Sequence, residues 1–327
     1  MSDRVLVTGA TGFTGGALAR RLLEDGAEVT LWVRAPERAA ALEQAGARVV
    51  AADLTDADAV RRHMTAFDAV YHVAAAFRTE HSTLEEFRRV NVTATRDLLE
   101  AARAAGVGRF VHCSTVGVQG EIDDPPASED YRFKPGDHYQ QSKLEGELVA
   151  REYFDSPLPV SVVRPVGIYG PGDRRFLKLF RPIRRGRFVM IGRGETLYHL
   201  TYIDDLVEGF RLAGREPGAV GEVFTIGGPR YTTLNELVAA IARAVDGPPV
   251  RLRIPYAPVH ALAWLCAKVC PKLGLAPPLY PRRVEFFSKS RAFSIEKARR
   301  LLGYRPRVDL EDGLARTAAW YRAEGWL

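Results

Sequence analysis

Short hydrophobic runs alternate with amphipathic segments along the chain as far as residue 226. Runs rich in β-branched residues occur at 4–7, 28–33, 48–52, 69–73, 109–113, 159–165 and 222–226, and their length is typical of buried strands. Between them, 17–23, 84–105 and a segment that begins near 138 are helical in composition, and 84–105 is expected to form one long amphipathic helix. This alternation predicts an α/β fold with a doubly wound parallel sheet.

A glycine-rich turn follows the first predicted strand. Gly9, Gly12 and Gly15 have the spacing G-x-x-G-x-x-G and stand directly before a predicted helix. Glycine lets the backbone approach a pyrophosphate closely, and the start of the helix offers free N–H groups and the positive end of its dipole. With Thr11 and Phe13, these residues are the candidate contacts of a dinucleotide, and a purely structural turn is the alternative.

The ends of the next three strands extend the candidate cofactor site. Arg34 stands where an acidic residue would hold a ribose 2′-hydroxyl, and a guanidinium suits a 2′-phosphate, so we expect NADP(H) to be preferred over NAD(H). The alternative is that Arg34 only leads into a solvated loop. Asp53 is a candidate acceptor for the adenine amino group and Leu54 a cover for its ring, while Ala74 and Ala75 leave room for the cofactor.

Two hydroxyl residues and a Tyr-x-x-x-Lys pair are the candidate reacting groups. Ser114 and Thr115 follow the fifth strand, and Tyr139 and Lys143 lie four apart on one face of the next helix. A free tyrosine hydroxyl titrates near pH ~10, so proton transfer at neutral pH requires a pKa about three units lower, and an ammonium one turn away supplies part of that shift. His72, at the end of the fourth strand, is interpreted as a packed structural residue.

In this order, the glycine turn, Asp53-Leu54, Ser114-Thr115 and Tyr139-x-x-x-Lys143 resemble the extended short-chain dehydrogenase/reductase family, part of the NAD-dependent epimerase/dehydratase superfamily. The resemblance implies that Tyr139 is the general acid/base and that Lys143 lowers its pKa and binds the nicotinamide ribose. It implies that Thr115 polarises the reacting oxygen, with Ser114 as the neighbouring catalytic hydroxyl. Pro165, at the end of the sixth strand, is a further cofactor contact on the same basis.

The segment after the sixth strand indicates which class of substrate to expect. Sugar-nucleotide enzymes of the family commonly have asparagine where Gly167 stands, so the pattern resembles the 3β-hydroxysteroid dehydrogenase-like branch. Gly167 and Tyr169, with Thr115, are the candidate substrate contacts. We therefore expect interconversion of a secondary alcohol and a ketone on an apolar, sterol-like small molecule. A nucleotide-sugar epimerase or dehydratase with tightly bound NAD is the first alternative, which Asn91 favours, and a non-catalytic dinucleotide-binding protein is the second.

The chain is expected to form two domains. Residues 1–172 and 200–228 are assigned to a Rossmann-type NAD(P)-binding domain, and 173–199 and 229–327 to a smaller, discontinuous substrate domain. Within the second, 257–280 is strongly apolar, and three interpretations remain open: a buried helix, a lid over an apolar substrate, or an interfacial patch with peripheral membrane contact. Asp204 and Asp205 are expected to cap a helix rather than to bind metal, and no metal site is predicted.

Composition and charge limit the kind of ligand and the cellular compartment that we expect. The net charge of +6, from 46 Lys and Arg against 40 Asp and Glu, suits an anionic ligand and is too evenly spread to indicate nucleic acid. No leader or apolar run long enough to span a bilayer is evident, and the odd count of three cysteines indicates reduced thiols, so a cytoplasmic protein is expected. By resemblance to family dimers, the helix from Leu84 and the helix after Tyr139 are expected to pair in a homodimer.

Overall fold

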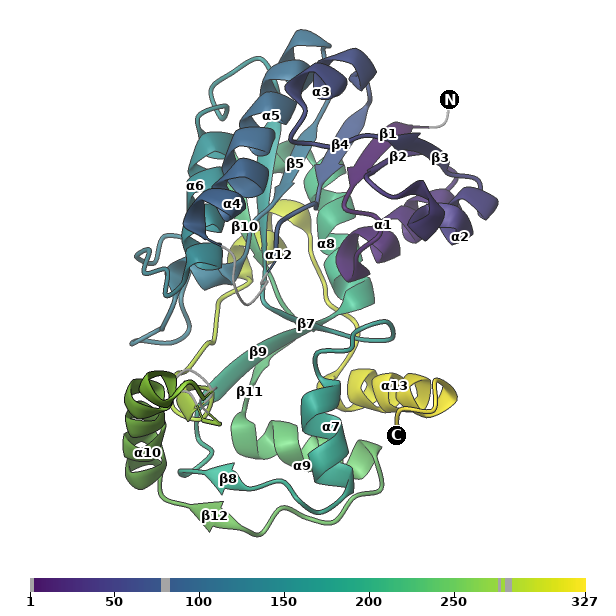
Figure 1. Cartoon of the computed structure of the whole chain (residues 1–327). Helices are drawn as coiled ribbons and strands as arrows, with labels where there is room; N and C mark the ends of the chain where they lie inside the picture. Colours follow the sequence, from purple (N-terminus) through teal and green to yellow (C-terminus); the bar gives the residue numbers. More distant parts are fainter. Residues whose placement is uncertain (1–2, 78–82, 276–277, 280–283) are drawn as a thin grey trace.

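The computed structural model describes residues 3–77, 83–275, 278–279 and 284–327, and its larger half is built on a parallel sheet of seven strands (Figure 1). The strand order is β10-β6-β5-β4-β1-β2-β3, and every neighbouring pair is parallel. The strands are β1 (Arg4–Thr8), β2 (Glu28–Val33), β3 (Arg48–Ala51), β4 (Ala69–His72), β5 (Phe110–Cys113), β6 (Val160–Pro165) and β10 (Glu222–Ile226). The prediction of a doubly wound parallel sheet is confirmed.

Helices cover both faces of this sheet because the strand residues alternate between two cores. In β1, Val5 and Val7 belong to one hydrophobic cluster with Leu18 and Phe210, whereas Leu6 belongs to the other with Leu98. The helices of the larger half up to residue 215 are α1 (Phe13–Glu24), α2 (Ala40–Gln44), α3 (Ala57–His63), α4 (Leu84–Arg88), α5 (Ala94–Ala104), α6 (His138–Arg151) and α8 (Ile203–Arg215). The helices cover the faces of the sheet and leave the carboxyl ends of the strands uncovered. Open α/β sheets bind their ligands at these ends.

The expected long helix over 84–105 is interrupted. A π-helical turn, Arg89–Thr93, separates α4 from α5, and Asn91 lies buried inside it. Asparagine is a poor helix former because its side chain competes for backbone hydrogen bonds. Here the amide of Asn91 bonds outside the helix, which is the reason for the altered turn at this position.

Among the residues that the structure describes, the smaller half combines two short sheets with the helices α7, α9, α10 and α13 (Figure 1). One sheet has the order β11-β9-β7 and the other pairs β12 with β8. Its elements are β7 (Gly167–Tyr169), α7 (Leu177–Arg184), β8 (Met190–Ile191), β9 (Leu197–Tyr202), β11 (Tyr231–Thr233), α9 (Leu234–Ala244), β12 (Arg253–Ile254), α10 (Tyr256–Val269) and α13 (Leu310–Ala323). Helices α9 and α13 pack together beside α7, and their buried side chains belong to the same hydrophobic cluster as Leu18 and Phe210 of the larger half.

The chain returns to the larger half before it ends, which differs from the predicted boundary at 229–327. Helix α12 (Glu296–Leu302) packs on β10 and α8, with Ala298 and Leu302 buried there. Asp205 was expected to cap a helix, but the N-cap of α8 is Tyr202. The Asp205 carboxylate instead accepts from the backbone N–H groups of Arg307 and Val308, at 2.8 and 3.1 Å, and so fixes the segment after α12.

Helix α10 is not the buried helix that the apolar segment 257–280 favoured. Ala263 is its one fully buried residue, and Leu262 and Leu265 are more than half exposed. Part of the predicted segment, at 276–277 and 280, lies outside the described residues. Across the part of the chain that the structure describes, no helix is both long and apolar enough to cross a membrane.

Candidate active site

The glycine turn between β1 and α1 lies against the end of β4. Gly9 has φ +77°, and a Cβ on it would stand 2.6 Å from the backbone N of Ala74, while a Cβ on Gly15 would stand 2.4 Å from the Gly9 carbonyl oxygen. Gly12 is the N-cap of α1 and provides no capping side chain. The first-turn N–H groups, which have no acceptor inside a helix, are therefore left for a ligand, and the turn fits the pyrophosphate of a dinucleotide.

The second part of the turn contacts the smaller half. Thr11 and Phe13 are half-buried, and the Arg175 guanidinium lies 5.9 Å from the centre of the Phe13 ring. Arg175 is oriented by Asp173, whose carboxylate it contacts at 2.7 Å. The turn predicted to bind the cofactor is thus bordered by a cation from the segment between β7 and α7.

Arg34 and Asp53 lie near one another after β2 and β3. The Asp53 carboxylate accepts from the backbone N–H and the hydroxyl of Thr55, both at 2.9 Å. The hydrogen bond from the Thr55 backbone, and then the charge of Arg34, hold the pKa of Asp53 below its ordinary value. Leu54 is 8% exposed and belongs to the same hydrophobic cluster as Trp32, so its side chain is part of the core beneath this edge.

Tyr139 and Lys143 lie on the first two turns of α6, at the carboxyl end of β5. The helix starts at His138 because Asp137 caps it, accepting from the backbone N–H of Gln140 at 2.7 Å. The Tyr139 ring makes an edge contact with Phe77, at 5.0 Å between ring centres. Lys143 is 2% exposed, and its Nζ donates to the carbonyl oxygen of Cys113 at 2.6 Å.

The buried ammonium of Lys143 affects its surroundings. Burial lowers its own pKa, against which the nearby Glu147 carboxylate acts in the opposite direction. Burial, and then the charge of Lys143, lower the pKa of His72 to about 3, so this imidazole is neutral. His72 bonds Thr8 at 2.9 Å and Thr95 at 3.0 Å inside the protein, which confirms its structural role.

The hydroxyl groups of Ser114 and Thr115, at the end of β5, lie in different surroundings. Ser114 is 3% exposed and donates to the Glu147 carboxylate at 2.6 Å, so it serves the interior rather than the predicted catalytic role. Thr115 is half-buried and accepts from the backbone N–H of Gly117 at 3.1 Å, at the start of a 3-10 turn. Thr115 is therefore the hydroxyl of this strand end that remains for a ligand.

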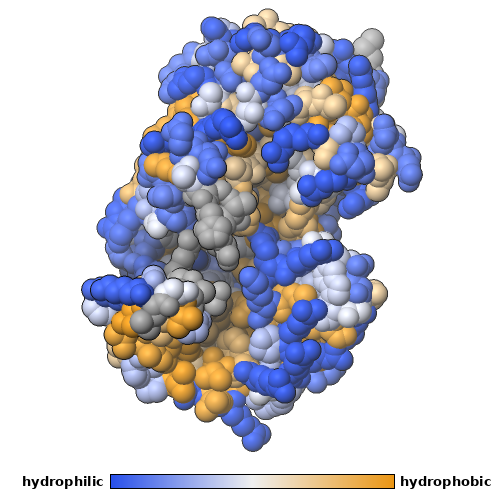
Figure 2. All heavy atoms as spheres, viewed as in Figure 1, coloured by the Kyte–Doolittle hydropathy of each residue, from blue (hydrophilic) through white to orange (hydrophobic). Residues whose placement is uncertain are grey.

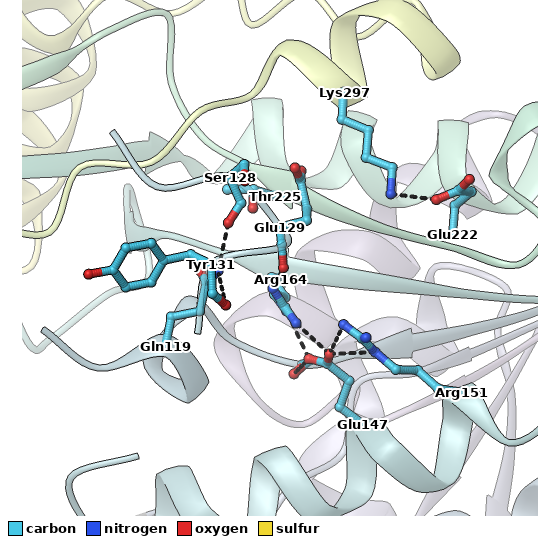
Figure 3. Close-up of polar contacts among 11 residues, drawn as sticks. Gln119, Ser128, Glu129, Tyr131, Glu147, Arg151, Arg164, Glu222, Thr225 and Lys297 are labelled. Carbon is cyan, nitrogen blue, oxygen red and sulfur yellow. Dashed lines mark hydrogen bonds and ion pairs between the residues drawn. The ribbon is translucent and has the colours of Figure 1, made fainter. Parts of the chain in front are cut away.

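A buried ion pair that the sequence reasoning missed fastens α6 to the sheet (Figure 3). Arg164, in β6, contacts Glu147, in α6, at 2.6 and 2.9 Å, and both side chains are fully buried. Arg151 contacts the same carboxylate at 2.7 Å from the next helical turn. Two signals were present in the sequence: a lone charge within a hydrophobic strand, and a glutamate one turn after Lys143.

The same cluster reaches the far edge of the sheet (Figure 3). Arg164 donates to the backbone oxygen of Glu129 at 2.8 Å, and the Glu129 carboxylate accepts from the backbone N–H of Thr225, in β10, at 2.8 Å. The loop that precedes α6 is thereby tied to β6 and β10.

Asn91 performs a similar function on the other side of α6. Its side chain accepts from the backbone N–H of Ala76 at 2.8 Å and donates to the Ala76 carbonyl at 3.1 Å and to the Ser142 hydroxyl at 2.9 Å. The segment after β4, which contains the half-buried Ala74 and Ala75, is thus connected to the residue that precedes Lys143.

The predicted substrate contacts after β6 are revised by their packing. Tyr169 is 2% exposed, with its ring 5.6 Å from that of Tyr202, so it is a core residue and is not placed against a substrate. A Cβ on Gly167 would stand 2.6 Å from the Leu200 side chain, because β7 pairs with β9 at this point. Pro165 is buried at the end of β6, where it pairs with Ile226.

Two hollows in the surface lie in the smaller half, away from Tyr139 and Lys143. One, of about 750 Å³, is lined by residues of 192–196, 253–256 and 287–290, and the other, of about 650 Å³, lies between α9 and β12. Among the described residues, no group of three His, Cys, Asp or Glu side chains is arranged to hold a metal ion.

A parallel sheet with this strand order, a glycine turn at a helix start, and a lysine and tyrosine on one helix row define a dinucleotide-binding enzyme of the dehydrogenase type. The chain belongs to the NAD dependent epimerase/dehydratase family, whose model matches residues 5–227. Its relatives place it among the extended short-chain dehydrogenases/reductases, on the branch similar to 3β-hydroxysteroid dehydrogenases.

Individual relatives are named for different reactions. The chain is 32% identical to 2-alkyl-3-oxoalkanoate reductase of Stenotrophomonas maltophilia, over 97% of this chain and 98% of that protein. It is 31% identical to a 3β-hydroxysteroid dehydrogenase/Δ5→4-isomerase of Mycobacterium tuberculosis, over 97% and 90%. Among solved structures, the dTDP-glucose 4,6-dehydratase DesIV of Streptomyces venezuelae, with NAD bound, matches with a TM-score of 0.77 at 29% identity, over 99% and 98% of the two chains.

We predict that Glu147→Gln lowers the free energy of unfolding by about 3–5 kcal/mol, because it leaves the Arg164 guanidinium buried without its counter-charge. Denaturant unfolding at neutral pH measures this change. The matched control is Glu152→Gln, at the end of the same helix, which removes the exposed ion pair with Arg96 and is expected to cost at most about 1 kcal/mol. Equal losses in the two variants would contradict the importance of the buried pair.

The pH dependence of this difference has a definite sign. Burial alone would raise the pKa of Glu147, but the hydrogen bonds and charge of Arg164 outweigh it and the pKa is lowered. A carboxylate with a lowered folded-state pKa contributes stability that is present above its unfolded-state pKa and is lost as the pH falls through the folded value. The stability gap between wild type and Glu147→Gln is therefore expected to narrow in acid.

Proposed function

We propose that this enzyme is an NAD(P)-dependent oxidoreductase that interconverts a secondary alcohol and a ketone on a largely apolar small molecule. The observation that carries the proposal is the placement of Tyr139 and Lys143 on one row of α6, with the Lys143 ammonium buried at the end of β5 beside Thr115. A bound nicotinamide cofactor would supply the hydride donor or acceptor. Proton transfer and the stabilisation of charge on the substrate are the tasks of the protein's own side chains.

Each of the three side chains has a separate task in this proposal. The Tyr139 hydroxyl gives a proton to the carbonyl oxygen of a ketone, or takes one from the hydroxyl of an alcohol. The Thr115 hydroxyl donates a hydrogen bond to the same oxygen and stabilises the negative charge that develops on it. The Lys143 ammonium stabilises a tyrosinate one helical turn away, and its bond to the Cys113 carbonyl fixes its position.

The cofactor is proposed to occupy the edge formed by β1, β2, β3 and β4. The open amides of α1 suit its pyrophosphate, and Asp53 is available to its adenine. Arg34 is exposed at the end of β2, where an arginine suits a 2′-phosphate. We therefore propose that NADP(H) is preferred and that NAD(H) is the weaker cofactor.

An apolar substrate is supported by the surroundings of Gly167. A Cβ at position 167 would lie 2.6 Å from the end of the Leu200 side chain, so a polar side chain that could hold a sugar nucleotide would need Leu200 to move. The names of two relatives, a 2-alkyl-3-oxoalkanoate reductase and a 3β-hydroxysteroid dehydrogenase, also indicate largely apolar substrates. A nucleotide-sugar epimerase or dehydratase remains the second candidate, which the match to DesIV favours.

A homodimer is proposed in which α5 and α6 pair with the same helices of a second copy. Leu148, on α6, is an exposed hydrophobic residue on this surface. This surface lies on the outer side of the helix that bears Tyr139, so pairing there would stabilise the position of α6.

Replacing Tyr139 with Phe is expected to reduce kcat at least about a hundredfold, because the proton donor is removed while the ring and its contact with Phe77 are kept. Steady-state kinetics on a small set of apolar ketones measures the loss of kcat. Fluorescence titration is expected to show that the variant binds NADPH nearly as tightly as the wild type. Tyr153→Phe, just beyond the end of α6, serves as the control and is expected to retain wild-type turnover. Normal activity in the Tyr139 variant would reject the proposed acid/base.

The Arg34→Asp variant is expected to weaken NADPH binding at least about tenfold relative to NADH, since a carboxylate repels a 2′-phosphate. Calorimetric titration of both cofactors measures the ratio. Arg48→Asp, an exposed position at the opposite end of the neighbouring strand, makes the same change of charge and is expected to leave the ratio unaltered. An unchanged ratio in both variants would remove the basis of the NADP(H) preference.

The two candidate reactions differ in how they treat the cofactor. An epimerase or dehydratase recycles it within one turnover, whereas an oxidoreductase must exchange it. We expect the purified enzyme to release little dinucleotide on denaturation, as measured by chromatography against protein concentration. Near-stoichiometric NAD in this assay would instead favour the nucleotide-sugar reaction.

A further inference from the structure

Helix α10 and its flanks carry the largest gathering of exposed hydrophobic side chains in the described chain. Of the eleven large hydrophobic residues that are exposed there, six fall between residues 252 and 275: Leu252, Leu262, Trp264, Leu265, Val269 and Leu275, with exposed fractions of 41–60%. Figure 2 shows hydrophobic side chains collected over the part of the molecule where α10 lies, at the lower left. Monomeric proteins seldom expose such a patch unless it binds a partner or a membrane.

The exposed side chains form an ordered surface on the helix. Leu262, Leu265 and Val269 are spaced at three and four residues and so share one stripe. Trp264 and Lys268 lie four apart on the neighbouring row, and the Lys268 Nζ stands 3.7 Å from the centre of the Trp264 ring. One side of α10 is thus held against the protein at Ala263, and the other presents leucine, valine and tryptophan outward.

Charge on this surface has a single sign. No acidic residue occurs in the sequence between Asp246 and Glu285. Exposed cations stand at both ends of the helix: Arg251 and Arg253 before it, and Lys268 and Lys272 at its end. The neighbouring acids are matched by cations of their own, because Glu195 lies 3.5 Å from Arg193 and Glu285 lies 3.1 Å from Lys289.

We propose that α10 docks this enzyme onto the surface of a bilayer that contains anionic lipids. An apolar helix face with lysines and arginines at its margins is suited to lie in the interface, with the apolar side chains below the headgroups and the cations beside lipid phosphates. Lys268 can keep its charged end at the headgroups while its stem lies along Trp264. The helix lies on the membrane rather than across it, as its 14 residues are too few to span.

A second copy of this chain is the less suitable occupant. Two such faces would bring Arg251, Arg253, Lys268 and Lys272 together, with no acidic residue of the segment to oppose them. An anionic lipid surface satisfies both the charge and the apolar stripe. The inference stands independently of the proposed reaction, and an apolar substrate would add a reason for the enzyme to reach a bilayer.

Co-sedimentation of the full-length enzyme with vesicles tests the proposal. We expect binding to vesicles of phosphatidylcholine with phosphatidylglycerol, weaker binding to phosphatidylcholine alone, and a decrease with added salt. The double variant Leu262→Asp/Leu265→Asp is expected to bind at least about tenfold more weakly, since two charges enter the apolar face. Lys268→Gln and Lys272→Gln are each expected to weaken binding about fivefold.

A matched variant and a spectroscopic readout separate docking from loss of fold. Val220→Asp changes an exposed hydrophobic residue on the larger half and is expected to bind as wild type. Cofactor binding and turnover on soluble substrate are expected to be unchanged in every variant. Trp264 emission is expected to shift to shorter wavelength with anionic vesicles, and the shift is expected to be absent in Trp264→Phe.

Three results would overturn the proposal. The first is no binding of wild type to anionic vesicles at low salt. The second is equal binding by the double aspartate variant. The third is a wild-type dimer that the double variant converts to monomer, which would show that α10 is an interface between protein chains.

Discussion

The buried ion pair between Glu147 and Arg164 is the interaction on which the candidate active site depends. Tyr139, Lys143 and Glu147 follow one row of α6, so whatever fixes the last of them also fixes the first two. An unpaired charge in the interior would be strongly unfavourable, which leaves α6 a single position relative to β6. Here a pair of opposite charges, more than apolar packing, determines where the reacting groups stand.

Lys143 is a buried cation at the strand ends beside this pair, with Glu147 as its nearby carboxylate. Lys143 bonds a carbonyl oxygen, and the two histidines near it, His72 and His112, are held neutral by burial and by its charge. An anion that forms close to Lys143 is therefore stabilised by a cation that is already in place. Catalysis by fixed charges needs such preorganisation, because no solvent has to rearrange as the reaction proceeds.

The sequence indicated those features that depend on neighbouring residues. The sheet, the turn at Gly9 and the pair on α6 follow from hydrophobic runs, glycine spacing and helical periodicity. Features that depend on distant partners were not accessible. Asn91 alters its helix because it bonds Ala76, and Tyr169 is buried because β9 supplies Tyr202 against it. Such contacts join segments between 15 and 33 residues apart in the chain, which periodicity does not report.

The return of the chain to the larger half has a mechanical consequence. The Tyr304 hydroxyl donates to the Gly227 carbonyl at 2.9 Å, and Asp205 holds the backbone at Arg307. A domain attached by one linker swings about it, but here several connections, far apart in the sequence, would have to deform together. Rotation of one half against the other about a single hinge is thereby restrained.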